Sequence, residues 1–207
     1  EQHPEFTEDL KLYKEWKDTA SKQGLRVRIG RWNVVGNPVA ILVDFTPFFS
    51  QKDEIFARFW EEYHLDSITG QWDYIEPCLF GFAVGKVIES FSDFHINKHM
   101  RCIAHFHEWM TASGILYLKN RRPFIASVFT THATVMGRCI AGNAQALYSS
   151  IRTVDADAKA REFNVVAKHS LEKTGAREAD CFTTVSDMTA TECEFFLHKK
   201  VDLVTPN

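Results

Sequence analysis

At several places in the sequence, an apolar run is followed by polar side chains that are able to bind a ligand or take part in catalysis. The clearest case is the segment from Phe124 to Arg138, which reads FIASVFTTHATVMGR. Its short apolar run, rich in β-branched and aromatic residues, predicts a buried parallel strand over 124–129. The threonines, His132 and Arg138 that follow predict a ligand site, because ligands of open α/β sheets bind outside the carboxyl ends of strands.

The same segment offers two ways to bind an anion. A helix that begins near Thr134 would turn its free N–H groups toward the crevice, where anions are stabilised. Arg138 would add a charge-assisted hydrogen bond to a phosphate or to a carboxylate such as Glu108. The residues fit equally well a plain turn in which His132 is hydrogen-bonded locally, so both interpretations stay open.

Residues 105–109 read HFHEW and close another apolar run. His105 and His107 are two residues apart, so on a strand they point to the same side. With Glu108 they are possible metal ligands, but no third ligand stands at a diagnostic spacing such as HExxH. We therefore predict no metal. Instead His107 and Glu108 form a polar pair at a strand end, where the dipole of the next helix favours the carboxylate.

Two further apolar runs end in polar residues. FTTVSD at 182–187 predicts a strand followed by a helix with Ser186 or Asp187 near its cap. VTPN at 204–207 predicts a strand and a turn, in which the Asn207 amide can hydrogen-bond a sugar hydroxyl. The four strand ends together predict a rim that binds a small polar ligand, without naming a reaction.

The elements that position these residues alternate regularly from residue 100 onward. We predict four strands (100–106, 124–129, 181–185 and 201–204) separated by helices (108–120, stretches up to Ala176 around a turn at 153–155, and 188–199). Strands that alternate with helices form βαβ units. The sequence therefore predicts an α/β fold with a Rossmann-like, mainly parallel sheet and helices on both faces.

The first hundred residues are less regular. We predict an amphipathic helix over 6–22, with Thr7 as its cap and Gly24 as its end. Strands at 26–32 and 39–44 form either a hairpin or neighbours in a mixed sheet. We also predict a helix over 79–91, in which two glycines allow close packing on the sheet. The aromatic residues of 45–77 fit a short helix over 53–63 with core contacts, or a stacking platform for sugars or bases.

The composition excludes several classes of function. The chain has 207 residues, of which 45% are hydrophobic and 25% charged, as in ordinary globular proteins of one or two domains. A net charge of −3 argues against a nucleic-acid partner. No apolar run approaches the ~20 residues of a membrane span, and the polar, acidic first residues predict no signal peptide. Five scattered cysteines predict buried thiols and a reducing cytoplasm rather than a disulfide framework.

Four of these segments, in this order, resemble the animal and fungal-type glycogen synthases. They are HFHEW at 105–109, FTTHATVMGR at 129–138, FTTVSDMTATE at 182–192 and VTPN at 204–207; RIGRW at 28–32 and LFGF at 79–82 fit more loosely. The resemblance is strong from about residue 79 to 207 and weak before residue 26. It implies a retaining glycosyltransferase of the GT-B type, in which two Rossmann-like domains face each other across a cleft.

The resemblance also implies an activity and its partners. Such enzymes transfer glucose from a sugar nucleotide, usually UDP-glucose with ADP-glucose as the alternative, to the non-reducing end of an α-1,4-glucan such as glycogen. They need no metal or other cofactor. Carried over by position, His132 lines the glucose subsite together with Thr131 and His107. Glu108 is an acidic residue of the same cleft, Arg138 lies near the sugar phosphate, and Asn207 binds the donor glucose.

The chain resembles most of the N-terminal, acceptor-side domain of that family. It lacks the family's first strand with its Lys-Val-Gly-Gly loop, and it lacks the C-terminal nucleotide-binding domain with its phosphate-binding Arg and Lys and its catalytic Glu. We therefore expect transfer only from a full-length cytoplasmic protein, in which a homo-oligomer is conceivable, and not from this chain alone. The alternative is a non-catalytic α/β carbohydrate-binding or regulatory module.

Overall fold

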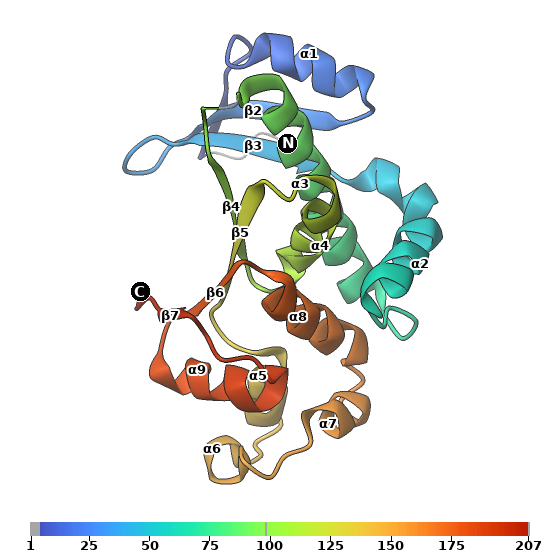
Figure 1. Ribbon diagram of the computed structural model, residues 1–207, viewed down its shortest axis with the longest axis vertical. Coiled ribbons are helices and arrows are strands. Elements are labelled where there is room, and N and C mark those ends of the chain that lie inside the picture. Colours follow the sequence, from blue (N-terminus) through green and yellow to red (C-terminus); the bar gives the residue numbers. More distant parts are fainter. Residues whose placement is uncertain (1–4, 98, 207) are drawn as a thin grey trace.

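The structure is a computed structural model that describes residues 5–97 and 99–206. It contains two sheets (Figure 1), a three-stranded sheet in the order β1-β2-β3 and a four-stranded sheet in the order β4-β5-β6-β7. In Figure 1 the three-stranded sheet lies at the top, and β6 and β7 lie lower, near the last helices. The predicted α/β fold with a parallel sheet is confirmed.

The four-stranded sheet is parallel throughout. It consists of β4 (Cys102–His107), β5 (Ile125–Thr131), β6 (Cys181–Thr184) and β7 (Leu203–Val204). The predicted strands are thus confirmed, with their ends shifted by a few residues. The register aligns His107 with Thr130, Thr130 with Thr183, and Thr183 with Leu203. The four carboxyl ends therefore meet at one edge, as the sequence predicted.

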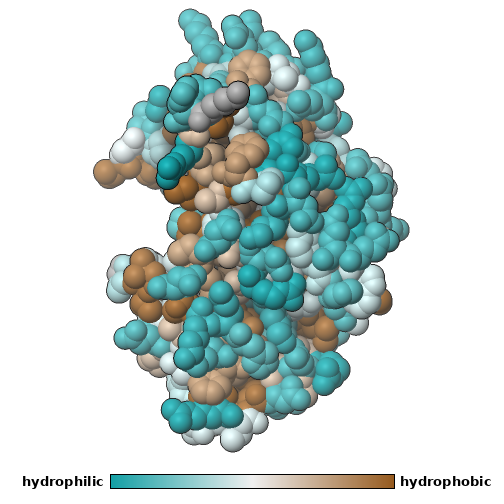
Figure 2. Space-filling view, viewed as in Figure 1, coloured by the Kyte–Doolittle hydropathy of each residue, from teal (hydrophilic) through white to brown (hydrophobic). Residues whose placement is uncertain are grey.

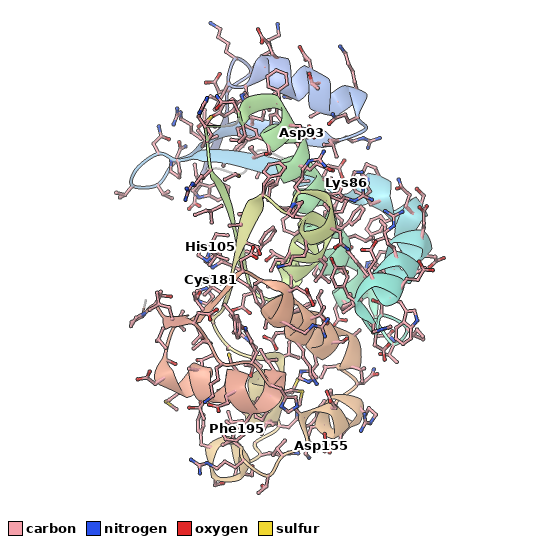
Figure 3. All side chains as sticks on the ribbon, in the orientation of Figure 1. Lys86, Asp93, His105, Asp155, Cys181 and Phe195 are labelled. Atoms are coloured by element: carbon pink, nitrogen blue, oxygen red, sulfur yellow. The ribbon has the colours of Figure 1, made fainter. Side chains whose placement is uncertain are left out.

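The two faces of this sheet differ in burial. On one face, Phe106, Phe129 and Phe182 form a row across three strands and are at most 2% exposed. The other face, which we call the open face, consists of the side chains that alternate with this row: Ile103, His105, His107, Val128, Thr130 and Thr183. Ile103 is 68% exposed. In Figure 2 the outline of the molecule is hollowed on the left, at about the height at which Figure 3 places His105.

The helices of the parallel sheet lie mainly on the phenylalanine side. All three crossovers step in one direction along the sheet, and right-handed crossovers that do so place their helices on the same face. Gly114 of α4 (Ala112–Arg121) accordingly lies against Phe106, and Gly175 of α8 (Val166–Glu178) lies against Phe129. We predicted helices on both faces of the sheet. Within the described residues, no helix covers the open face at Ile103, which is 68% exposed.

The long helix α3 (Trp72–His95) contains the predicted helix 79–91 and extends it at both ends. We predicted that its small residues pack on the sheet, but they pack on α4 instead. A Cβ on Gly81 would overlap the Ser113 hydroxyl, which donates a hydrogen bond to the Cys78 carbonyl over 2.7 Å. Close helix–helix contact therefore explains the glycine.

The three-stranded sheet is antiparallel and corrects one prediction. Strand β2 (Arg26–Trp32) pairs with β3 (Val39–Asp44) as a hairpin, which confirms one of the two alternatives. The predicted helix over 6–22 is wrong in its first half, because β1 (Phe6–Glu8) pairs with β2 and buries Phe6. Helix α1 (Lys14–Lys22) starts later, and Thr7 is a strand residue rather than a cap.

The aromatic segment 45–77 is largely core. It forms a 3₁₀ turn (Thr46–Gln51) and helix α2 (Lys52–Tyr63), which confirms the predicted short helix. Phe59 and Tyr74 are 2% and 0% exposed, whereas Trp60 and Trp72 are 50% and 58% exposed. The core interpretation therefore holds for the segment, with two tryptophans at its surface.

The remaining elements lie after β5 and β6. They are α5 (Val135–Gly142), α6 (Leu147–Ser150), α7 (Ala156–Glu162), α8, and α9 (Asp187–Glu192), which continues as a π-helical turn (Cys193–Leu197). The predicted turn at 153–155 and the predicted cap are confirmed, since the Ser186 hydroxyl accepts from the Thr189 N–H over 3.1 Å. All five cysteines are free. Within 5–97 and 99–206, no helix is long and apolar enough to cross a bilayer.

Candidate functional site

A row of hydrogen-bonded side chains runs across the open face near the carboxyl ends of three strands. His105 Nε2 lies 2.7 Å from Thr130 Oγ1, which lies 2.6 Å from Thr183 Oγ1. Both hydroxyls are buried, at 3% and 5% exposure. Figure 3 shows His105 on the side of β4 that faces away from α3 and α4. The row therefore presents an exposed imidazole fixed by buried hydroxyls.

Two more histidines continue this surface toward the strand ends. The rings of His105 and His107 lie 4.1 Å apart, as their spacing on a strand predicted. His107 Nδ1 lies 3.2 Å from Nε2 of His132. Burial lowers the pKa of His107, electrostatic repulsion involving His105 and His132 lowers it further, and Glu108 opposes both effects. His107 is therefore neutral near pH 7, with one donor and one acceptor nitrogen, a combination that suits hydroxyl groups.

Glu108 ties the end of β4 to the loop that carries His132. Its backbone has φ 65° and ψ 158°, a conformation that is rare outside glycine and costs about 1–3 kcal/mol. Its N–H donates to the Thr130 carbonyl over 2.8 Å, and its Oε1 accepts from the His132 N–H over 2.9 Å. These bonds hold the strained turn at the point where β4 and β5 end.

Arg138 lies on α5 and faces Glu108. Its Nη2 is 3.7 Å from Glu108 Oε1, and its side chain is 62% exposed against 15% for the glutamate. The ion pair expected from the sequence is thus present but long. Most of the guanidinium remains available to an anionic ligand.

Thr131 is fully buried and points away from the open face, because adjacent residues of a strand alternate. Its Oγ1 lies 3.0 Å from Oε1 of Glu172, on α8. Its carbonyl accepts from the Thr184 hydroxyl over 2.7 Å. Thr131 therefore supports the loop from behind, and the structure gives no support for direct contact between its side chain and a ligand.

The start of α5 is also held from within. Thr134 is the cap, as a helix beginning near it requires, and its Oγ1 accepts from the Gly137 N–H over 2.9 Å. The Val135 N–H donates to Glu172 Oε2 over 2.9 Å. These two first-turn donors are consequently not free to bind an anion, contrary to our expectation.

A third carboxylate, Glu192 of α9, completes the support. Its Oε2 accepts from the Thr134 hydroxyl over 2.7 Å, and its Oε1 accepts from the Tyr148 hydroxyl over 3.1 Å. A Cβ on Gly137 would overlap this carboxylate. The loop 131–135 is thus bound by Glu108, Glu172 and Glu192, which come from three different parts of the chain.

The environment of Glu172 sets its charge. Burial raises its pKa to about 8, hydrogen bonds from Val135 and Thr131 act in the opposite direction, and the charges of Glu108 and Glu192 raise it again. Glu172 is therefore protonated at neutral pH, unlike an exposed glutamate.

Asn207 lies outside the described residues. Among the His, Cys, Asp and Glu side chains that are described, no group of three is placed to hold a metal ion.

The sequence did not single out Glu172 as a site residue, and it gave Glu192 only as the last letter of a motif. Glu172 stands beside Leu171 on α8, where the surrounding helix positions are buried. A glutamate among buried positions of a helix is rare unless it has hydrogen-bond partners. That pattern was the available signal, but it does not reveal the partner.

Comparison with known proteins agrees with the resemblance found in the sequence motifs. The family model described as glycogen synthase matches residues 5–207. The liver glycogen [starch] synthase of Mus musculus is 33% identical over 190 residues, which is 92% of this chain and 27% of that protein. Glycogen [starch] synthase isoform 2 of Saccharomyces cerevisiae is 29% identical over 98% of the chain and 28% of its own length. The glycogen [starch] synthase of Dictyostelium discoideum is 31% identical over 90% of the chain and 21% of its own.

The chain therefore spans about a quarter of the length of the curated relatives that it matches. The family model, by contrast, covers nearly the whole chain, including every strand end that forms the site. The sequence motifs, the parallel sheet and this match agree, and the chain belongs to the glycogen synthase family.

Proposed function

We propose that this chain is the acceptor-side, N-terminal domain of a retaining GT-B glycosyltransferase. The full-length protein would transfer glucose from a sugar nucleotide to the non-reducing end of an α-1,4-glucan, as the family names suggest. The observation that carries the proposal is the placement of His132 beside His107 at the carboxyl ends of the parallel sheet, 3.2 Å apart. Ligands of such sheets bind at this edge.

The residue types suit a sugar and an oxocarbenium-like transition state. The neutral His107 and the ring of His132 supply hydrogen bonds to hydroxyl groups. Prearranged dipoles around the sugar ring stabilise developing positive charge at little reorganisation cost. Glu108 already accepts the His132 N–H, so we assign it a positioning and electrostatic role. The exposed Arg138 would approach the sugar phosphate.

The proposal includes the donor and the setting. UDP-glucose is the proposed donor, with Asn207 hydrogen-bonded to its glucose, and recognition of the base is assigned to the second domain. No metal or other cofactor takes part. The full-length protein would act in the cytoplasm on glycogen, with homo-oligomerisation as a further expectation.

An assay of the full-length protein tests the proposal. Glucose incorporation into glycogen is measured with UDP-glucose and with ADP-glucose as donors. His132→Ala should lower kcat by about 100-fold, because a misplaced or missing positioning group has effects of that order. His99→Ala, at an exposed histidine that precedes the amino end of β4, opposite the carboxyl ends that form the site, is the matched control and should leave kcat unchanged. Unaltered transfer by His132→Ala would remove this residue from the site.

Calorimetry on the 207-residue chain separates the proposal from its alternative. We expect weak or no binding of UDP-glucose, because the nucleotide-binding half is assigned to the other domain. Micromolar binding would show that the donor site lies in this half. Glucan binding by a full-length protein that transfers no glucose from either donor would instead indicate a carbohydrate-binding module.

A further inference from the structure

The loop from Thr131 to Val135 is held at both ends by one side chain. Glu172 Oε1 lies 3.0 Å from Thr131 Oγ1, and Glu172 Oε2 accepts from the Val135 N–H over 2.9 Å. Glu172 is 0% exposed and lies on α8, behind the sheet. We propose that Glu172 is a positioning residue for His132, and that its proton decides which partner Thr131 bonds.

The choice arises because the Thr131 hydroxyl has a single proton. Its Oγ1 lies within reach of two oxygens, Glu172 Oε1 at 3.0 Å and the Ala133 carbonyl at 3.3 Å. When Glu172 is protonated, its O–H donates to Thr131 Oγ1, and Thr131 donates to Ala133. When Glu172 is ionised, Thr131 must donate to the carboxylate, and the Ala133 carbonyl loses the hydrogen bond from Thr131.

The proton is placed by the surroundings of Glu172. Its hydrogen-bond partners are neutral, and the carboxylates of Glu108, after β4, and Glu192, on α9, disfavour a further negative charge. Among the described residues, the thiols of Cys139 on α5 and Cys193 after α9 also interact with its charge. The raised pKa of about 8 agrees with a protonated group at neutral pH.

Ala133 directly follows His132, so the switch acts next to the site. His132 is anchored by its N–H to Glu108 and by its ring to His107, at 2.9 and 3.2 Å. Freeing the Ala133 carbonyl loosens the loop on the far side of the histidine. A displacement of about 1 Å at such a residue can lower a rate 100-fold. The inference rests on the proposed function only for its kinetic test.

The kinetic test follows glucose transfer by the full-length protein from pH 6 to pH 9.5. Glu172→Gln keeps a donor toward Thr131 and an acceptor for Val135, and it cannot ionise. We expect kcat of the wild type to fall above about pH 8, approaching tenfold per pH unit, with little change in KM. Glu172→Gln should retain its neutral-pH kcat at pH 9. Glu178→Gln, on the same helix and paired with Arg177, should follow the wild type.

Hydrogen–deuterium exchange of the peptide that contains 131–138 tests the loop without activity. Rates are divided by those of an unstructured reference peptide at each pH. Protection should decrease from pH 7 to pH 9 in the wild type and in Glu178→Gln, but not in Glu172→Gln. An identical alkaline loss in Glu172→Gln and the wild type, in kcat or in protection, would overturn the inference, and so would loss of protection in Glu172→Gln at pH 7.

The two measurements separate the two proposals. A wild type that transfers no glucose from either donor refutes the proposed function, while the exchange data still decide the role of Glu172. A working wild type with pH-independent loop protection refutes only the role of Glu172.

Discussion

Glu172 and Glu8 show how differently the two sheets of this protein use a carboxyl group. At the three-stranded sheet, Glu8 accepts from Arg28 Nε over 3.0 Å and from Lys17 Nζ over 3.3 Å, and its side chain is 26% exposed. The hydrogen bond from Arg28 is the main cause that lowers its pKa. Beside the parallel sheet, Glu172 is fully buried, is hydrogen-bonded to two neutral groups, Thr131 Oγ1 and the Val135 N–H, and has a raised pKa.

The difference follows from what each region has to do. A partly exposed ion pair joins α1 to the antiparallel sheet, where water and salt screen it and its net contribution is small. A buried neutral acid holds the site loop, where every unmet hydrogen bond would be costly. The parallel sheet therefore depends on polar groups in its interior, whereas the antiparallel sheet carries them at its surface.

The largest expected effect comes from removing each carboxyl group. Glu172→Ala leaves Thr131 and the Val135 N–H without their partner, so the free energy of unfolding should fall by about 2–4 kcal/mol. Glu8→Ala should lower it by only about 0.2–1 kcal/mol. Urea unfolding of the wild type and both variants at pH 6 measures the two changes in the free energy of unfolding. Equal losses would remove the contrast between the two sheets.

A glycine next to the buried network gives the next effect. Gly137→Ala places a methyl group against the Glu192 carboxylate and should destabilise the protein by about 1–3 kcal/mol. Gly142→Ala at the end of the same helix, where a Cβ meets nothing within 4 Å, is the matched control. It should be neutral or slightly stabilising. A harmless Gly137→Ala would show that Glu192 moves freely and that the loop support is soft.

The two carboxyl groups should also give opposite dependences on pH. Unfolded Glu172 releases its proton near pH 4.5 and folded Glu172 near pH 8, so its contribution is complete below 4.5 and lost as pH rises to about 8. The slope is at most about 1.4 kcal/mol per pH unit. Glu8, with a lowered pKa, contributes above its unfolded value and loses its contribution as pH falls.

Unfolding free energies of the wild type and Glu172→Gln at pH 5, 6.5 and 8 test the predicted loss of the Glu172 contribution as pH rises. The difference between Glu172→Gln and wild type should grow in favour of the variant as pH rises. A constant difference would mean that Glu172 is ionised throughout.

Salt should produce the smallest effect. Raising NaCl from 0.05 to 0.5 M shortens the Debye length. The Glu8–Arg28 coupling energy measured in a double-mutant cycle should therefore fall by about 0.3 kcal/mol. The coupling between Glu172 and Thr131 should not change, because both are buried. A salt-sensitive coupling there would contradict the neutral hydrogen bond.

Local sequence patterns predicted much of the parallel sheet. Apolar runs of strand length that end in polar residues located β4, β5 and β6, and alternation placed His105 and His107 on the same side. The same reasoning missed β1, because Phe6–Glu8 is a strand only through its pairing with β2, which lies some twenty residues away. The apolar residues of that segment have helical spacing, so our prediction extended the helix α1 through it.

The sequence by itself determined which residues stand at the strand ends, since hydrophobic runs and polar stops are local properties of the chain. Only the tertiary structure decided that Thr130 faces the open side and Thr131 faces α8. The fold likewise brought Glu172 and Glu192 to the loop from about 40 and 60 residues further along the chain. Burial and long-range hydrogen bonds depend on how elements pack, so no local pattern contains them.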